Sequence, residues 1–182
     1  EDEPYRQQLL ERHNRADNMT TRMNVLHALN RRHDHYREQA LATYYNKYRD
    51  QPLVIDKWFA VQAQEHSEGA LARITALAEH PDFHPDNPNR FRALVSTLMQ
   101  QNPAIFHAED GSGYRFAASQ IRRILLSNPQ VAARMLNGYA IVSRMDNERK
   151  ALVRAELETL AAVDGISVDV RENLERLQRG LQ

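Results

Sequence analysis

The amino-acid sequence predicts an all-α fold. Apolar residues recur every three or four positions along the chain, which is the spacing of one face of a helix. The alternation of apolar and polar residues that is typical of strands is nearly absent. The breaks between the apolar stripes share a helix-starting signal, the dipeptide Asn-Pro, which occurs three times. A chain of 182 residues, 42% hydrophobic and 26% charged, suits one globular domain or one large piece of a bigger protein.

The stripes predict about ten helices of roughly 10–16 residues each. In the first half of the chain the stripes are Met19, Met23 and Leu26; Leu41, Tyr44, Tyr45 and Tyr48; Ile55, Trp58 and Phe59; and Leu71, Ile74, Leu77 and Ala78. In the second half they are Phe91, Leu94, Val95 and Leu98; Val131, Met135, Tyr139 and Val142; Val153, Leu157 and Leu160; and Val170, Leu174, Leu177 and Leu181. Because each stripe covers about 100° of a helix, we expect it to face a neighbouring helix.

The helix boundaries carry capping signals. In each Asn-Pro pair, the Asn side chain can accept a free N–H of the first turn, and proline fits the next position because its missing N–H costs nothing there. The expected N-caps are Asn87, Asn102, Asn128, Asp146 and Ser167, and the expected loops contain Pro81, Pro85 and Gly165. Without a residue-level repeat, periodicity alone leaves both a helix bundle and a stacked solenoid open.

The charge balance excludes some partners. Lys and Arg together number 24, as do Asp and Glu, so the net charge is zero and we expect no nucleic-acid partner. No apolar run approaches the roughly 20 residues of a membrane span, so we expect no membrane partner. The absence of cysteine fits a reducing compartment, and we expect a cytoplasmic location. The chain opens at Glu1-Asp2 without methionine, which indicates an internal cut.

The histidines do not form a pattern that binds metal. A zinc peptidase needs H-E-x-x-H, and none of the eight histidines stands in that pattern. His80 and His84 have the required spacing, but the prolines that follow them forbid a regular helix, and neighbours within His33-Asp34-His35 point to different sides of a helix. We expect a solvated surface at both places. With no nucleophile elbow or phosphate loop either, the sequence predicts no catalytic and no metal-ligating residue of its own.

The segment from Phe106 to Tyr114 has the residue types of a tight turn. Gly111 and Gly113 flank a serine after Asp110, and positive φ is available at both glycines. We expect a fixed loop in which the Asp110 side chain accepts backbone N–H groups and Tyr114 packs inward. A direct contact with a substrate is the less favoured alternative.

The helix that Asn128-Pro129 opens has a polar face made of Gln130, Arg134 and Asn137. Gln130 lies in the first turn, where free N–H groups and the helix dipole favour anions. Arg134 offers a planar fork that suits a carboxylate. From the residues alone, a solvated polar face is the preferred interpretation.

Four stretches of the chain resemble the C-terminal domain of bacterial aminopeptidase N, in the family's order and at similar spacing. They are residues 53–63 (LVIDKWFAVQA), 87–94 (NPNRFRAL), 106–114 (FHAEDGSGY) and 128–132 (NPQVA), and Asn18-Met19-Thr20 resembles the family's lead-in. The resemblance covers the chain from about Asp17 onward, while residues 1–16 match poorly. It implies that residues 1–182 are a single helical domain, a fragment of a larger enzyme.

The resemblance implies a HEAT/armadillo-like superhelix of antiparallel helix pairs that closes over the active site of a thermolysin-like domain. The enzyme would remove N-terminal residues from peptides, with its zinc and its general base upstream of this domain. The fragment would wall the cavity and gate the entry of peptides, without activity or cofactor of its own. Its partners would be the upstream catalytic domain of the same chain and peptide substrates. The residues at the positions of Gln130 and Arg134 line that cavity in the family, which implies a substrate-binding role for both.

Two alternatives remain at this stage. A free-standing helical solenoid that holds a protein or peptide on its concave face fits the composition and periodicity equally well. Its last helix, with Arg171, Glu172 and Glu175, is polar enough to end a stack, whereas the first segment, with Tyr5 ahead of Leu9, is a poorer cap. The other alternative, a metalloenzyme that uses the histidines, is the least favoured.

Overall fold

The computed structural model describes residues 3–182, and the proposed internal cut at Glu1-Asp2 lies outside the described residues. Within this range the chain is helical throughout and contains no strand. The first helices are α1 (Glu3–Arg15), α2 (Met19–Leu29), α3 (His35–Tyr48), α4 (Pro52–Ala63) and α5 (Ala70–Leu77). They are followed by α6 (Pro88–Phe91), the π-helical segment η1 (Arg92–Ser96), α7 (Thr97–Gln101), α8 (Pro103–Phe106) and α9 (Ser112–Ile124). The last are α10 (Pro129–Leu136), the 3₁₀ segment η2 (Asn137–Arg144), α11 (Asn147–Ala161) and α12 (Val168–Gly180).

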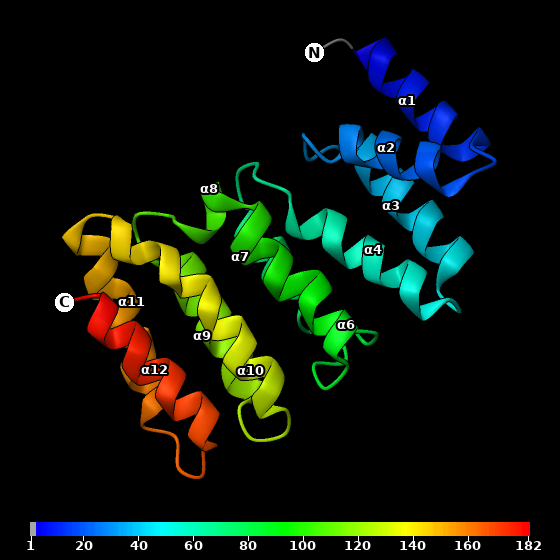
Figure 1. Cartoon of the computed structure of the whole chain (residues 1–182). Coiled ribbons are helices and arrows are strands. Elements are labelled where there is room, and N and C mark those ends of the chain that lie inside the picture. The colour runs from blue at the N-terminus through cyan, green and yellow to red at the C-terminus, as the bar shows by residue number, and fades with distance from the viewer. Residues whose placement is uncertain (1–2) are drawn as a thin grey trace.

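The helices form an elongated stack. Since α6, η1 and α7 are continuous, as are α10 and η2, residues 3–182 make 11 helices, against the prediction of about ten. In Figure 1, α1–α3 lie at one end, α11 and α12 lie at the other, and α4, α6–α7 and α9–α10 fill the space between. Each group packs on the next: α3 on α4, α4 on η1, α8 on α9, and α10 on α12.

The range of the contacts distinguishes a stack from a bundle. No side-chain hydrogen bond within residues 3–182 joins positions more than 45 apart in sequence. Repeat proteins have this property because each repeat contacts only its neighbours. The prediction of a superhelical stack of helix pairs is therefore confirmed.

The apolar stripes form the core, as expected. Its largest fully buried side chains are Tyr44, Tyr114, Tyr139, Phe59, Phe91 and Phe106, and they belong to one continuous cluster that runs along the stack. The three apolar residues at 53–55 lie inside α4, where Leu53 is exposed and Ile55 is buried, because helical spacing places them on different faces.

The predicted caps are confirmed. The side chains of Asn87, Asn102, Asn128, Asp146 and Ser167 each accept a backbone N–H from the first turn of α6, α8, α10, α11 and α12 respectively. Asn18 and Asp34 do the same for α2 and α3, which the sequence analysis did not anticipate. Gly165 lies in a loop with φ of 80°.

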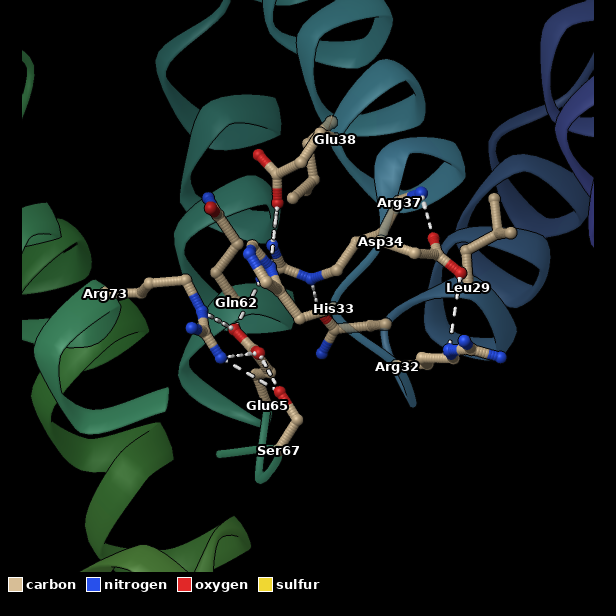
Figure 2. A network of polar contacts seen from close by, with 12 residues as sticks. Leu29, Arg32, His33, Asp34, Arg37, Glu38, Gln62, Glu65, Ser67 and Arg73 are labelled. Carbon is tan, nitrogen blue, oxygen red and sulfur yellow. Dashed lines mark hydrogen bonds and ion pairs between the residues drawn. The ribbon is translucent and has the colours of Figure 1, made fainter. Parts of the chain in front are cut away.

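A buried ionic network holds the N-terminal half of the stack together (Figure 2). Glu65, in the loop after α4, forms ion pairs with Arg37 of α3 and Arg73 of α5, and its side chain is only 1% exposed. Arg37 Nε also donates to Asn30 Oδ1 at the end of α2, over 2.9 Å. The Glu65 carboxylate therefore joins α3 and α5 to the end of α4, and Arg37 extends the network to the end of α2. Periodicity could not predict this network, because its members lie far apart in sequence.

One expectation about the histidines is wrong. His80 is half-buried, and its ring packs against Tyr45, Trp58 and Phe59 with centroid distances of 5.4, 5.3 and 5.7 Å. Its Nδ1 accepts the N–H of Asp82 over 3.1 Å, so the proline-rich turn places the ring inward. His84, His33 and His35 are exposed, as expected.

None of the helices in the described part of the chain combines the length and the hydropathy that a membrane span requires.

Candidate functional site

An open groove lies where α7 and α8 face α10 and η2. Its volume is about 390 Å³, and its lining consists of Met99, Gln100, Pro103, His107, Arg134, Asn137, Gly138 and Ile141. Arg134 is one of the two predicted site residues. No aspartate, glutamate, serine or cysteine belongs to this lining, so its one formal charge is positive. The arrangement suits a ligand that offers oxygen acceptors and some apolar surface.

The two predicted residues occupy different positions relative to this groove. Asn128 caps α10 and Pro129 occupies its first position, which sets Gln130 and Arg134 one turn apart on an exposed face. Arg134 lines the groove, whereas Gln130 lies a turn nearer the start of α10 and is not part of the lining. The third polar position, Asn137, lines the groove as well.

The guanidinium of Arg134 has no ion-pair or hydrogen-bond partner within residues 3–182. Other arginines of the chain form ion pairs: Arg37 with Glu65, Arg90 with Asp56, and Arg149 with Asp146. An exposed guanidinium with all its donors free, at the wall of a groove without carboxylates, is available to an anionic ligand.

The segment from Phe106 to Tyr114 forms the turn that precedes α9. The Asp110 carboxylate accepts the backbone N–H and the hydroxyl of Ser112 over 2.9 and 2.6 Å, which confirms the expected fixed turn. Gly111 has φ of 71°, but Gly113 is helical, so the expectation of positive φ at both glycines is correct for Gly111 only. Gly113 is required for a different reason: a Cβ there would lie 2.3 Å from the carbonyl oxygen of Ile105.

His107 is a lining residue that the sequence analysis missed. Its Nδ1 lies 2.8 Å from the hydroxyl of Tyr114. Tyr114 is fully buried, as expected, and its ring packs against Phe106 and Tyr139 with centroid distances of 5.1 and 6.2 Å. Burial lowers the pKa of the His107 imidazole, and the positive charge of Arg149 lowers it further, so the ring is neutral at neutral pH.

The floor of the groove depends on Gly138. A Cβ on Gly138 would lie 2.5 Å from Cε of Met99, so the missing side chain leaves room for the end of the Met99 side chain. Ile141, which is 46% exposed, adds an apolar wall. Gly138 and Ile141 lie in η2, which continues α10, and they line the groove together with Arg134.

The residues that the structure describes offer no place for a zinc ion. No group of three or more His, Cys, Asp or Glu side chains within residues 3–182 is close enough together to hold a metal.

The stacked helix pairs and the groove between successive layers define a helical-repeat domain of the armadillo class. The chain belongs to the family described as a domain of unknown function (DUF3458_C) with ARM repeats, whose family model matches residues 1–179.

Two relatives named aminopeptidase N support the resemblance to that family. Aminopeptidase N of Caulobacter vibrioides is 46% identical over 136 residues, which are 75% of this chain and 16% of that protein. Aminopeptidase N of Haemophilus influenzae is 38% identical over 169 residues, which are 92% of this chain and 19% of that protein. The chain thus spans less than a fifth of these curated relatives.

A solved structure has the same fold. The crystal structure of Legionella pneumophila aminopeptidase A in complex with aspartic acid matches with a TM-score of 0.90 and 28% identity, over 97% of this chain and 21% of that one. The resemblance to the C-terminal region of aminopeptidase N is confirmed.

Proposed function

We propose that residues 1–182 are the C-terminal helical domain of a zinc aminopeptidase of the aminopeptidase N type, which removes N-terminal residues from peptides. The observation that carries this proposal is the match to aminopeptidase N of Haemophilus influenzae, which covers 92% of this chain but only 19% of the relative. Such a ratio is expected when a chain corresponds to one domain of a larger enzyme.

In this proposal the domain walls the active-site cavity and gates the entry of peptides. The groove supports the role, because its lining offers hydrogen-bond donors and apolar surface but no carboxylate, thiol or hydroxyl side chain. Arg134 would meet the carboxylate or a backbone carbonyl of a short peptide, and Gln130 would donate a hydrogen bond nearby. The domain would contribute shape and orientation and no proton transfer of its own.

The partner of this domain would be a catalytic domain upstream in the same polypeptide, and that domain would hold the zinc. The absence of a ligand cluster among residues 3–182 is consistent with this division of labour. The proposal includes a bacterial cytoplasmic location, which the cysteine-free sequence fits.

The test is an assay of the full-length product of the parent gene. We expect an open frame upstream of Glu1 that encodes H-E-x-x-H, and a purified protein that releases N-terminal residues from unblocked peptides. A chelator should abolish turnover, zinc should restore it, and peptides with acetylated N-termini should not react. Residues 1–182 alone should show no turnover. A start codon immediately before Glu1 would instead support a free-standing helical scaffold.

A further inference from the structure

Three side chains direct unused hydrogen-bond donors toward the groove. They are the guanidinium of Arg134, the amide of Gln100 and the imidazole of His107, all of which line it. Within residues 3–182 no acceptor occupies Arg134, the Gln100 amide, or Nε2 of His107. Because polar groups around a groove are normally satisfied by protein, water or ligand, this concentration of free donors predicts a ligand rich in oxygen acceptors.

The contact with Tyr114 determines which nitrogen of His107 carries the proton. The Tyr114 hydroxyl has one proton and two neighbouring acceptors, Nδ1 of His107 at 2.8 Å and the sulfur of Met145 at 3.7 Å. An imidazole nitrogen at hydrogen-bond distance is the better acceptor, since a thioether accepts only weakly. Tyr114 therefore donates to Nδ1, and the neutral ring carries its proton on Nε2. The free nitrogen of His107 is thus a donor.

The turn before α9 holds this pair in place. Gly111 supplies the left-handed residue at which α9 begins, and Gly113 lets the first turn of α9 lie against the backbone of Ile105 and Phe106. Tyr114 follows at once and is fully buried, so its hydroxyl cannot move away from His107. Arg149 adds a hydrogen bond from Nε to the carbonyl of His107 over 3.3 Å. The whole segment therefore acts as a rigid support for one imidazole.

We infer that His107, held by Tyr114, is a peptide-contacting residue that donates Nε2–H to the C-terminal carboxylate of a short peptide, beside Arg134. Arg134 supplies the charge, and His107 supplies a directed neutral donor. Met99 and Ile141 provide an apolar surface for the last side chain of the peptide. Tyr114 is a positioning residue that acts only through His107. The choice of a peptide as the ligand rests on the proposed function.

The inference is tested by calorimetric titration of the full-length protein, stripped of metal so that no turnover occurs. The probe is a tripeptide that ends in leucine, used as the free acid and as the C-terminal amide. We expect His107→Ala to weaken binding of the free acid by about 3- to 10-fold, the effect of one hydrogen bond, and to affect the amide less. His107→Gln, which keeps an N–H donor, should recover most of the loss.

The role of Tyr114 is tested by a double-mutant cycle. Tyr114→Phe keeps the buried ring and removes the hydroxyl, and it should weaken binding of the free acid in the wild-type background but add nothing to His107→Ala. Matched controls are His84→Ala and Tyr5→Phe, which alter an exposed histidine and an exposed tyrosine away from the groove. Thermal unfolding of each variant verifies that it is folded. If His107→Ala does not fold, His107→Phe, which keeps a ring but has no donor, takes its place.

The outcomes separate this inference from the proposed function. If the zinc-loaded protein hydrolyses peptides but the folded variant that lacks the donor, His107→Ala or His107→Phe, binds the free acid as wild type does, the inference is wrong and the proposed function stands. If peptides bind with the expected dependence on His107 but are not hydrolysed, the proposed function is wrong and the groove contact stands. A Tyr114→Phe loss of equal size in both backgrounds would show that Tyr114 does not act through His107.

Discussion

The side-chain amide of Asn102 donates a hydrogen bond to the backbone carbonyl of Glu65, with 2.6 Å between Nδ2 and the oxygen. The same amide donates to the carbonyl of Ala63 over 2.9 Å, while its oxygen caps α8. Asn102 is 3% exposed, so one side chain both starts a helix and satisfies the buried end of α4. Asn128, which also precedes a proline, only caps its helix.

This difference predicts unequal costs for two similar substitutions. Asn128→Ala should lower the free energy of unfolding by about 1 kcal/mol, the usual value of an N-cap. Asn102→Ala should lower it by about 3 kcal/mol or more, because two buried carbonyl groups also lose their donor. Denaturant unfolding of residues 1–182 measures both. Equal losses would show that the two extra hydrogen bonds contribute nothing.

Glu65 should be the most sensitive acidic residue of the stack. Burial alone would raise the pKa of its carboxyl, but hydrogen bonds from Arg73 and Ser67 and the charge of Arg37 outweigh this and lower it. Glu65→Gln leaves Arg37, whose side chain is 3% exposed, with only the exposed carboxylate of Glu38 as an ion-pair partner. We expect a loss of about 3–5 kcal/mol in the free energy of unfolding.

A matched control for Glu65 is Glu175→Gln on α12. Its ion pair with Arg179 is solvent-exposed, so the loss should stay below about 1 kcal/mol. Both variants are measured by denaturant unfolding at neutral pH. A small loss in Glu65→Gln would mean that water or the carboxylate of Glu38 compensates the Arg37 charge.

Three glycine-to-alanine substitutions should differ in sign and size. Gly113→Ala places a Cβ 2.3 Å from a backbone oxygen and should cost about 3 kcal/mol. Gly111→Ala forces an L-residue to φ of 71° and should cost about 1–2 kcal/mol. Gly180→Ala, whose Cβ would meet nothing within 4 Å, should stabilise the protein by about 0.5 kcal/mol. Thermal unfolding of the three variants gives the order of their stabilities. If Gly113→Ala left the stability unchanged, this would contradict the close approach of α9 to Phe106.

Acid should destabilise the fold before the carboxylates titrate. His13 is fully buried, and burial lowers the pKa of its imidazole. A hydrogen bond with Asn14 raises this pKa in part, while the charges of Arg22 and Lys47 lower it further. Below about pH 6.5 the unfolded chain binds protons that the folded chain resists, so the stability present above pH 6.5 is lost as the pH falls. One such histidine contributes a slope of up to about 1.4 kcal/mol per pH unit.

The measurement is the free energy of unfolding between pH 7.5 and pH 5 for the wild type and for His13→Gln. The substitution should reduce the slope, and the exposed His84→Gln, at a histidine without an ion pair within residues 3–182, serves as control. The pKa values of His27, His80 and His107 are also lowered by burial, so part of the slope should remain. An unchanged slope in His13→Gln would show that His13 becomes solvated when it is protonated.

In the full-length protein, Arg134→Ala should weaken peptide turnover mainly through KM. Because the contact is remote from the reacting bond, it contributes to binding in the ground state and the transition state alike, so KM should rise about tenfold with kcat nearly unchanged. Gln130→Ala should change KM less, since Gln130 is not part of the groove lining. Arg171→Ala, an exposed arginine on α12, is the control. Unchanged peptide kinetics in Arg134→Ala would exclude it as a substrate contact.

The predictions that rest on neighbouring residues, such as the helix caps, are confirmed. The predictions that are wrong concern side chains whose partners lie far away in the sequence. Asn87, Asn102 and Asn128 cap helices because a cap involves residues two or three positions apart. His80 was placed on the surface because prolines surround it, but the aromatic residues of α3 and α4 enclose its ring. A single histidine such as His107 has no sequence pattern that indicates a site, whereas the glycine-rich segment that positions it has the pattern of a tight turn.

By itself the sequence determined the all-α class, the caps of α6, α8, α10, α11 and α12, and the resemblance to aminopeptidase N. These depend on residues within about four positions of one another, or on the order of short stretches. Only the tertiary structure decided that Glu65 neutralises Arg37, that Gly113 touches Ile105, and that Arg134 but not Gln130 shares a groove with His107. The physical reason is that packing sets how neighbouring helices are rotated and offset against each other, and this determines which polar side chains meet.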